Sequence, residues 1–363
     1  MYSFEPTEEQ RMLVDAALKF AQKDLRPAAH EADEARQVPK ALVEKGWELG
    51  LLPASIPEAY GGFGERSAVT MALAAEELAY GDLAAAMEIL APNLFALPIL
   101  IEGSEEQKQS YLPEFSAGGY LPAAAALIEP RRDFQAGMLK TTAREDKGDW
   151  VLEGEKCFVP LAAEAQHFLV YAALDGKTQG FIVHKDAPGL IVGEREWNMG
   201  IQALPTYSLK LENCKVPCKD RLGGESGHDF APIINASRTA LAALAIGVSR
   251  AAYEYALNYA KEREAFGEPI AHRQSIAFML AEMATEIEAT RLMVWEAAWL
   301  LDEGRDATRE SYLAKITADD ISLMVTDRAV QILGGHGYIR DHPVEMWLRN
   351  ARGFTTFEGL AII

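Results

Sequence analysis

Apolar positions recur with the period of an α-helix near the start of the chain. Leu13, Leu18 and Phe20 follow this period, and Thr7 followed by Gln10 is typical of a helix-capping box. Helical patterns continue to residue 112, with a break around residues 102–104, after which Ser104 is placed to cap the next helix. The first third of the chain is therefore predicted to be helical.

Between residues 121 and 220 the pattern changes to short apolar runs such as WVLEG, HFLVYAAL and YSLKLENCKVP, bounded by Gly, Asp, Asn and Pro. These runs predict strands of an antiparallel sheet or barrel. Long helical segments return after Gly224. We therefore predict an α+β protein with an N-terminal α-helical domain (1–120), a middle antiparallel β domain (121–225) and a C-terminal four-helix bundle (226–363).

Charge and cysteine content narrow the function classes. Thirty-five basic and 54 acidic residues give a net charge of -19, which argues against binding to nucleic acid or to an anionic membrane. The three cysteines show no metal-ligand spacing, so no metal site is expected. The N-terminus carries acidic residues where a signal peptide has basic ones, and no unbroken apolar run long enough to span a bilayer is evident. We expect a cytoplasmic protein.

The segment from Gln331 to Gly359 holds the candidate chemistry. Three of the four residues at positions 334–337 are glycines, so a phosphate or a backbone can approach closely there, although such a turn also commonly ends a helix. Glu358 follows an aromatic residue close to the end of the sequence, where a solvated carboxylate is the simpler interpretation. Neither feature alone decides between these alternatives.

Several phrases occur in the order found in one flavoprotein family: IPEAYGGFG (56–64), EEQKQSYLPEFSAG (105–118), KVPCKDRLGG (215–224), KEREAFGEPIAHRQSIAFMLAEMA (261–284) and QILGGHGYIRDHPVE (331–345). By these phrases the chain resembles the acyl-CoA dehydrogenases along nearly its whole length. The resemblance implies FAD as cofactor, an acyl-CoA thioester as substrate and α,β-dehydrogenation as the reaction.

The resemblance also implies roles for two residues of the substrate site. Glu358, in the phrase Phe-Glu-Gly-Leu, matches the catalytic base, which takes the α-proton while hydride leaves the β-carbon for flavin N5. Some relatives carry the base near positions 235–238, but Asn, Ala, Ser and Arg stand there, so no rival acid exists. Arg238 matches an arginine at the substrate mouth, and a surface salt bridge is an equally good interpretation of it.

A second set of positions matches cofactor contacts. Arg263 and Phe266 lie in a phrase like the family's RxxFG, whose arginine reaches the pyrophosphate of a neighbouring subunit's FAD. Gln274, Gln331 and the glycine pair match positions near the adenosine end, and that pair is Gly334 and Gly335. A site shared between subunits implies a homotetramer or heterotetramer, and the family's electron acceptor implies an electron-transfer flavoprotein as partner.

The chain departs from the family where the flavin ring binds. The motif Leu-Thr-Glu-Pro reads Leu-Ile-Glu-Pro at 127–130, and Phe134 replaces a serine. In the second ring motif, Phe158 can still pack against the ring, but Pro160 has neither the hydroxyl nor the N–H that a donor to flavin N5 needs. Arg131 and Arg132 are candidates for new contacts to phosphate groups.

These departures leave three functions open. The first is a self-sufficient acyl-CoA dehydrogenase, in which side chains around Glu77, Asn93 and Phe95 set the acyl chain length. The second is a non-catalytic or half-site subunit that completes a partner's FAD site. A flavin oxidase or a protein that only binds acyl-CoA is the third.

Overall fold

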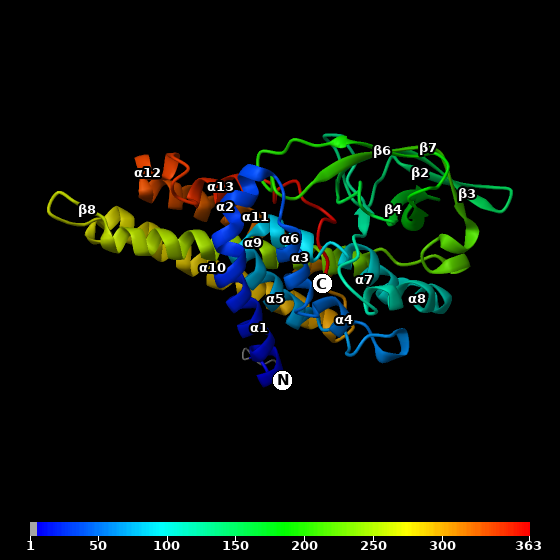
Figure 1. Cartoon of the computed structure of the whole chain (residues 1–363), viewed down its shortest axis with the longest axis horizontal. Coiled ribbons are helices and arrows are strands. Elements are labelled where there is room, and N and C mark those ends of the chain that lie inside the picture. Colours follow the sequence, from blue (N-terminus) through cyan, green and yellow to red (C-terminus); the bar gives the residue numbers. More distant parts are fainter. Residues whose placement is uncertain (1–5) are drawn as a thin grey trace.

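The computed structural model describes residues 6–363; residues 1–5, the start of the N-terminal segment that argues against a signal peptide, lie outside the described residues. Helices form both ends of the chain and a sheet forms its middle (Figure 1). The α+β class predicted from the sequence is confirmed.

The first region is helical, as the periodicity predicts. Both capping boxes form: Thr7 and Gln10 close the start of α1, and Ser104 and Gln107 close the start of α8. The helices of this region are α1 (Glu8–Phe20), α2 (Arg26–Ala35), α3 (Lys40–Trp47), α4 (Leu51–Ser55), α5 (Ala68–Gly81), α6 (Leu83–Ile89), α7 (Asn93–Glu102) and α8 (Glu105–Tyr111), with a π-helical turn at Ala21–Leu25 joining α1 to α2.

The middle region is a seven-stranded sheet in which β4 is the branching point. The strands are β1 (Ala124–Ala126), β2 (Thr142–Asp146), β3 (Asp149–Pro160), β4 (His167–Leu174), β5 (Lys177–His184), β6 (Leu190–Arg195) and β7 (Thr206–Pro217). Their order is β1-β4-β2-β3-β7-β6, with β5 paired to β4. The strands β1 and β2 both run parallel to β4, so the sheet is mixed and the expectation of a wholly antiparallel sheet is corrected.

The third region consists of three long helices and three short elements. They are α9 (Ala231–Glu262), α10 (Gln274–Asp302), α11 (Thr308–Leu333), α12 (Gly335–Tyr338), α13 (Val344–Ala351) and the hairpin β8 (Glu264–Ala265) with β9 (Glu268–Pro269). The helix α5 of the first region packs against α9. Gly247 allows this close contact, because a Cβ there would lie 2.2 Å from the Glu76 carbonyl oxygen.

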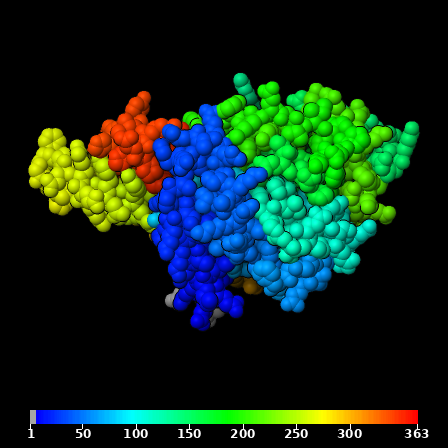
Figure 2. Space-filling view, viewed as in Figure 1, coloured from blue at the N-terminus to red at the C-terminus, as the bar shows by residue number. Residues whose placement is uncertain are grey.

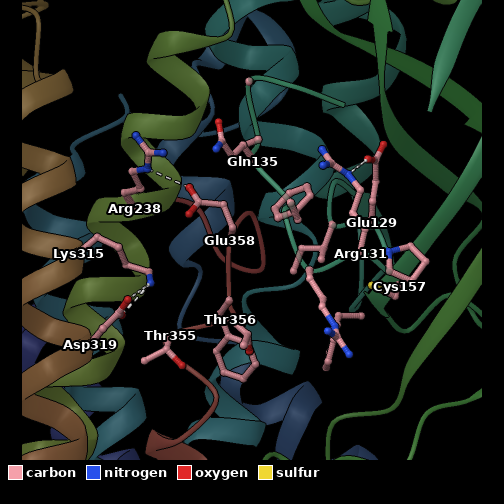
Figure 3. A pocket seen from close by; sticks show the side chains of 18 of the residues that line it. Glu129, Arg131, Gln135, Cys157, Arg238, Lys315, Asp319, Thr355, Thr356 and Glu358 are labelled. Atoms are coloured by element: carbon pink, nitrogen blue, oxygen red, sulfur yellow. Dashed lines mark hydrogen bonds and ion pairs between the residues drawn. The ribbon is translucent and has the colours of Figure 1, made fainter. Parts of the chain in front are cut away.

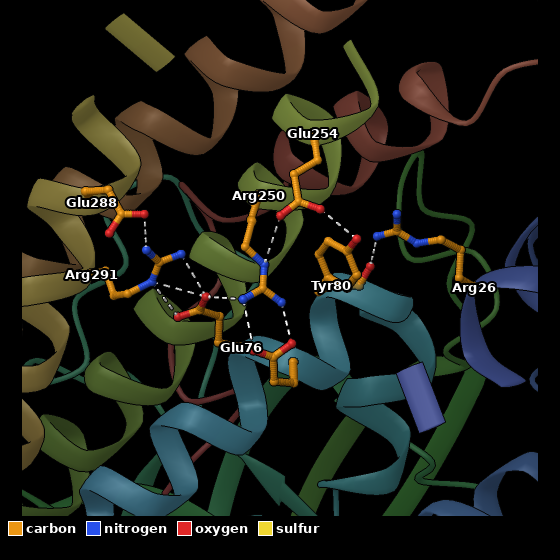
Figure 4. Close-up of polar contacts among 8 residues, drawn as sticks. Arg26, Glu76, Tyr80, Arg250, Glu254, Glu288 and Arg291 are labelled. Atoms are coloured by element: carbon orange, nitrogen blue, oxygen red, sulfur yellow. Dashed lines mark hydrogen bonds and ion pairs between the residues drawn. The ribbon is translucent and has the colours of Figure 1, made fainter. Parts of the chain in front are cut away.

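A buried ion network fixes α5, α9 and α10 relative to one another (Figure 4). Glu76 and Glu77 on α5 are almost fully buried. Arg250 on α9 donates to both carboxylates, and Arg291 on α10 donates to Glu76 at 2.9 Å. Because an unpaired buried charge costs several kcal/mol, about 3–5 when one partner is removed, this network specifies one arrangement of the three helices.

Within the part of the chain that the structure describes, one helix has the length and composition of a membrane span. The apolar window of α9 would suffice to cross a bilayer, and the bent pair α6 and α7 would count as a second candidate. This does not contradict the expectation that the chain has no unbroken apolar run of that length, because Arg238 and Arg250 interrupt α9. Moreover, 83% of its window is buried inside the protein, as in the central helix of a packed bundle.

An arm projects from the body of the molecule (Figure 2). It consists of the paired ends of α9 and α10, the hairpin β8–β9 at its tip, the C-terminal end of α11 and the adjoining α12. Phe266 at the tip is 97% exposed. The Tyr259 hydroxyl and His336 Nδ1, 2.7 Å apart, connect α9 to α12.

Candidate active site

A cavity of about 870 Å³ opens between the sheet, α9, α11 and the loop that precedes Glu358 (Figure 3). Its walls come from segments far apart in the sequence, which pack together because the helical bundle lies against the sheet. The lining residues are Ile128–Arg132, Phe134–Gly137, Cys157, Phe158, Arg238, Tyr312, Lys315, Ile316, Asp319 and Thr355–Glu358.

Glu358 and Arg238 meet inside this cavity. The Arg238 Nε on α9 donates to Glu358 Oε1 at 2.9 Å, and the two side chains are 20% and 22% exposed. The guanidinium also lies 5.4 Å from the centre of the Tyr312 ring. Arg238 thus forms a salt bridge, but inside the cavity and not on the outer surface. Its contact with substrate stays a prediction.

A second ion pair lies on α11, on the same side of the cavity as Arg238 (Figure 3). Lys315 Nζ donates to the Asp319 carboxylate at 2.7 Å and to the Phe354 carbonyl oxygen at 2.8 Å. Burial raises the pKa of Asp319 to about 6, Lys315 opposes this shift and Glu358 adds to it. The sequence analysis missed this pair, although the spacing of Tyr312, Lys315 and Asp319 places them on one helix face.

The two ring motifs of the sequence lie side by side. The Ile128 carbonyl oxygen accepts from Cys157 N at 3.0 Å, and the buried Lys156 Nζ donates to Leu127 O and to Glu129 Oε1. Burial alone would raise the pKa of Glu129, but Lys156, neighbouring main-chain N–H groups and Arg131 outweigh it and lower the value to about 2. This cluster fixes the sheet side of the cavity.

Arg131 and Arg132, the two arginines suggested to contact phosphate, differ in how many of their hydrogen-bond donors are free. Arg131 donates to Glu129 and to the carbonyl oxygens of Asp133 and Met138. Its guanidinium is therefore occupied within the loop, and the suggestion that it contacts phosphate loses support. Arg132 is exposed at the rim of the same cavity.

Phe158 faces the cavity from a bulge in β3. The register of β3 against β7 shifts between Lys156 and Val159, and Phe158 has φ of 55°, a conformation that costs about 1 kcal/mol or more for a side-chain-bearing residue. Its N–H donates to the Glu196 carboxylate at 3.0 Å, which stabilises the bulge. The bulge turns an aromatic ring toward the space where a planar cofactor would lie.

The cavity fits a flavin in size and in its aromatic wall, but its donors are not the family's usual ones. Ile128 has no hydroxyl and Pro160 has no N–H, and the N–H groups of Cys157 and Phe158 are already paired. Gln135 and Arg132 offer side-chain donors at the cavity, whereas the hydroxyls of Thr355 and Thr356 donate to the carbonyl oxygens of Arg352 and Gly353 and remain available as acceptors.

The remaining predicted cofactor residues lie elsewhere. Arg263, Phe266, Gln274, Gln331 and the glycine pair are exposed on the arm and do not line the cavity. The pair consists of Gly334, where α11 ends with φ of 58°, and Gly335, where a Cβ would meet nothing within 4 Å. Steric crowding within this chain therefore gives no reason for glycine at position 335.

The residues expected to set acyl chain length have other partners. Glu77 pairs with Arg250, Asn93 donates to the Ile362 carbonyl oxygen at 3.3 Å, and Phe95 is buried beside Tyr111 and His167. These contacts do not test the expectation, which stays a prediction. A small pocket beside Glu358 is lined by other residues: Leu94, Pro98, Ala125, Leu127, Tyr171, Phe230, Ile233, Ile234, Ser237, Gly359, Ala361 and Ile362.

Comparison with known protein families matches three consecutive models. Residues 7–119 match the acyl-CoA dehydrogenase N-terminal domain, residues 124–214 the middle domain and residues 231–361 the C-terminal domain. The chain belongs to the acyl-CoA dehydrogenase family. It is accordingly an oxidoreductase of an FAD-dependent family that acts on acyl-CoA thioesters.

Individual relatives are similar to this chain over nearly their whole length. An acyl-CoA dehydrogenase of Bacillus subtilis is 37% identical over 97% of this chain and 95% of its own. The human mitochondrial short-chain specific acyl-CoA dehydrogenase is 36% identical over 99% of this chain and 89% of its own. The butyryl-CoA dehydrogenase of Megasphaera elsdenii superposes with a TM-score of 0.89 at 34% identity, covering 99% of this chain and 96% of its own.

No cluster of three or more potential metal ligands is found among residues 6–363.

Proposed function

We propose that this protein dehydrogenates acyl-CoA thioesters between the α and β carbons, with Glu358 as the base that removes the α-proton. The observation that carries the proposal is the position of Glu358, whose carboxylate faces a cavity large enough for a cofactor ring and a thioester. Gly359 follows Glu358 and lines the small apolar pocket beside it, so a base at position 358 stands where an acyl chain would enter.

Arg238 is proposed to position the base. In the free protein it holds the Glu358 carboxylate at the cavity wall through a single hydrogen bond. Because only one hydrogen bond joins the two side chains, a thioester that binds between them can separate them. The carboxylate is then free to accept the α-proton.

Bound FAD supplies the hydride acceptor. Phe158, Thr355 and Thr356 would hold the cofactor on the side of this subunit. Arg263, Gln274, Gln331, Gly334 and Gly335 would hold the cofactor of a neighbouring copy, because the arm that carries them projects away from the body. The open space around Gly335 supports close approach by a group outside this chain.

The acyl-CoA itself requires a basic surface, since the chain as a whole is acidic. A second cavity of about 300 Å³ adjoins the first and shares Arg131, Gln135 and Gly137 with it. Lys140 and Lys177 line this second cavity. We place the phosphate groups of coenzyme A there.

An electron-transfer flavoprotein is proposed to reoxidise the bound flavin. The protein is proposed to act as a homotetramer or as a heterotetramer with a related subunit.

One observation favours the alternative of a half-site subunit. Ile128 and Phe134 line the cavity with apolar side chains where the family has hydroxyls, and Pro160, two residues after the cavity-lining Phe158, has no N–H. The arm nevertheless retains its cofactor residues. In that case the protein would complete the FAD site of a partner.

Purification of the protein by itself, with FAD added, separates the two functions. The proposal predicts a flavin absorbance band near about 450 nm that bleaches when butyryl-CoA is added without oxygen. A colourless protein that becomes yellow only with a related subunit would establish the half-site function instead. A yellow protein that no acyl-CoA of any length bleaches would contradict the dehydrogenase.

A further inference from the structure

The small pocket beside Glu358 contains a buried hydroxyl without a partner. The Oγ of Ser237 makes no hydrogen bond among residues 6–363, and the residue is 3% exposed. Leaving a buried hydroxyl unpaired costs about 1–3 kcal/mol, so such a group calls for an explanation.

Two other hydroxyl-bearing residues of α9 show that the helix does not force a buried hydroxyl to stay without a hydrogen bond. The Thr239 hydroxyl donates to the Asn235 carbonyl oxygen at 2.8 Å, and the Ser249 hydroxyl donates to the Ala245 carbonyl oxygen at 2.7 Å. In both cases the hydroxyl donates to the carbonyl oxygen four residues earlier, as Ser and Thr commonly do within helices. The Ser237 hydroxyl does not make this bond and instead lines the pocket.

The rest of the pocket wall is neutral, and one more hydroxyl stands in it. Tyr171 on β4 lines the same space, and burial raises the pKa of its hydroxyl well above the usual value, so that it stays a protonated donor. The other lining side chains are apolar, and no charged residue takes part. A carboxylate at this point would therefore lack a cation to offset its burial.

The dimensions limit what can enter. The free volume is about 10 Å³, close to that of one water-sized probe, against about 870 Å³ for the neighbouring cavity. Leu94 and Pro98 on α7 and Ile362 stand in its wall. A long acyl chain would have to displace all three.

We propose that the pocket selects a short acyl group that carries a neutral hydrogen-bonding oxygen beyond its β-carbon, recognised by the hydroxyls of Ser237 and Tyr171. This assignment rests on the proposed dehydrogenase function and names its substrate class. The acyl Cα lies at Glu358, and the chain then runs past Gly359 toward Ser237, one residue before the Arg238 that pairs with the base. The substrate oxygen gives the Ser237 hydroxyl its missing partner.

The test compares three acyl-CoA substrates of equal chain length: pentanoyl-CoA, 4-hydroxypentanoyl-CoA and glutaryl-CoA. We expect kcat/KM for the 4-hydroxy compound to exceed that for pentanoyl-CoA by about tenfold or more, because a site built to bond a hydroxyl discriminates against the analogue that lacks it. Glutaryl-CoA, with its terminal carboxylate, is expected to be the poorest of the three.

Two variants show whether the hydroxyls cause the preference. Ser237→Ala and Tyr171→Phe should each reduce the ratio of 4-hydroxypentanoyl-CoA to pentanoyl-CoA by about tenfold, with pentanoyl-CoA oxidised as well as before or better. Ser249→Ala, on the same helix but bonded to its own backbone, should leave the ratio unchanged. Because removal of an unpaired buried hydroxyl is not expected to destabilise the fold, Ser237→Ala remains interpretable.

The outcomes are distinct. If pentanoyl-CoA is oxidised as fast as the hydroxylated compound and Ser237→Ala changes nothing, the substrate assignment is wrong and the dehydrogenase stands. If glutaryl-CoA is preferred, the neutral pocket is likewise refuted. If none of the three compounds, nor butyryl-CoA, reduces the bound flavin, the proposed function itself fails.

Discussion

Glu88 on α6 shows how burial without pairing leaves a group sensitive to pH. Its Oε2 makes no hydrogen bond among the described residues, and burial raises the pKa of the carboxyl to about 8, with Glu164 adding to the shift and Arg195 opposing it. The folded protein thus holds this proton more tightly than the unfolded chain. The stability that Glu88 contributes is complete at acid pH and falls as the pH rises toward 8.

Exchange of Glu88 for Gln should therefore stabilise the protein at alkaline pH only. At about pH 9 the free energy of unfolding should rise by about 2 kcal/mol. At about pH 5 it should hardly change. Urea unfolding at both pH values measures this, with the exposed Glu9→Gln as control. Equal effects at the two pH values would contradict the assignment.

Lys140 and Lys177 should act on substrate affinity alone. Reversal of either charge to Glu should raise the KM for acyl-CoA about tenfold and leave kcat nearly unchanged, because the phosphates bind equally in the ground and transition states. Steady-state kinetics with Lys19→Glu, an exposed lysine on α1, provides the control. An unchanged KM would remove coenzyme A from the second cavity.

At the scale of elements, side chains that bond to the backbone of another segment connect the helical regions to the sheet. The buried Gln107 of α8 accepts from the N–H groups of Ser104 and Gly223 and donates to the carbonyl oxygens of Lys219 and Arg221. The capping box thus extends beyond its own helix. It holds the segment that leads from β7 toward α9, and so the position of α9 relative to the sheet.

Replacement of Gln107 by Leu should be costly, because four main-chain groups lose their partner. We expect a loss of about 2–4 kcal/mol in the free energy of unfolding, measured by denaturant titration. Gln109→Leu on the same helix removes one exposed bond to Glu105 and should cost less than about 0.5 kcal/mol. If both variants lose the same stability, Gln107 does not connect the two regions.

Sequence patterns predicted the elements well and their partners less well. The periods of 3.6 and 2 fixed α9, α10, α11 and the long strands, because burial of one helix face or strand face is recorded locally in the chain. The parallel pairing of β1 and β2 with β4 was missed, because strand partners depend on contacts between distant segments. The position of cavity residues depends on the same long-range contacts. Glu358 and Phe158 could be named from local motifs, whereas Lys315 and Asp319 line the cavity because α11 packs beside it, which no local motif records.

At the scale of the whole molecule, the candidate cofactor residues fall into two separate groups. Phe158 and Glu358 share a cavity, while Arg263 and Gln331 lie on the exposed arm. A single copy therefore cannot bring all of them to one ligand. Under the proposed function, a second copy of the chain would bring its arm to this cavity.

Arg263→Glu should accordingly reduce cofactor retention without disturbing the fold. We expect the ratio of bound flavin to protein to fall at least about fivefold, because a repelling charge replaces a phosphate contact. Absorbance after gel filtration measures the ratio, and Arg309→Glu, an 80% exposed arginine on α11, is the control. Full flavin content in Arg263→Glu would remove the arm from the cofactor site.

The central claim is that Glu358 removes the α-proton, and the rate at which butyryl-CoA bleaches the bound flavin in the absence of oxygen tests it most directly. In Glu358→Gln the rate should fall by about 10²–10⁴-fold, while the dissociation constant for butyryl-CoA changes by less than about threefold. Glu9→Gln should behave as the unmodified protein. Bleaching of Glu358→Gln at the unmodified rate would contradict the account.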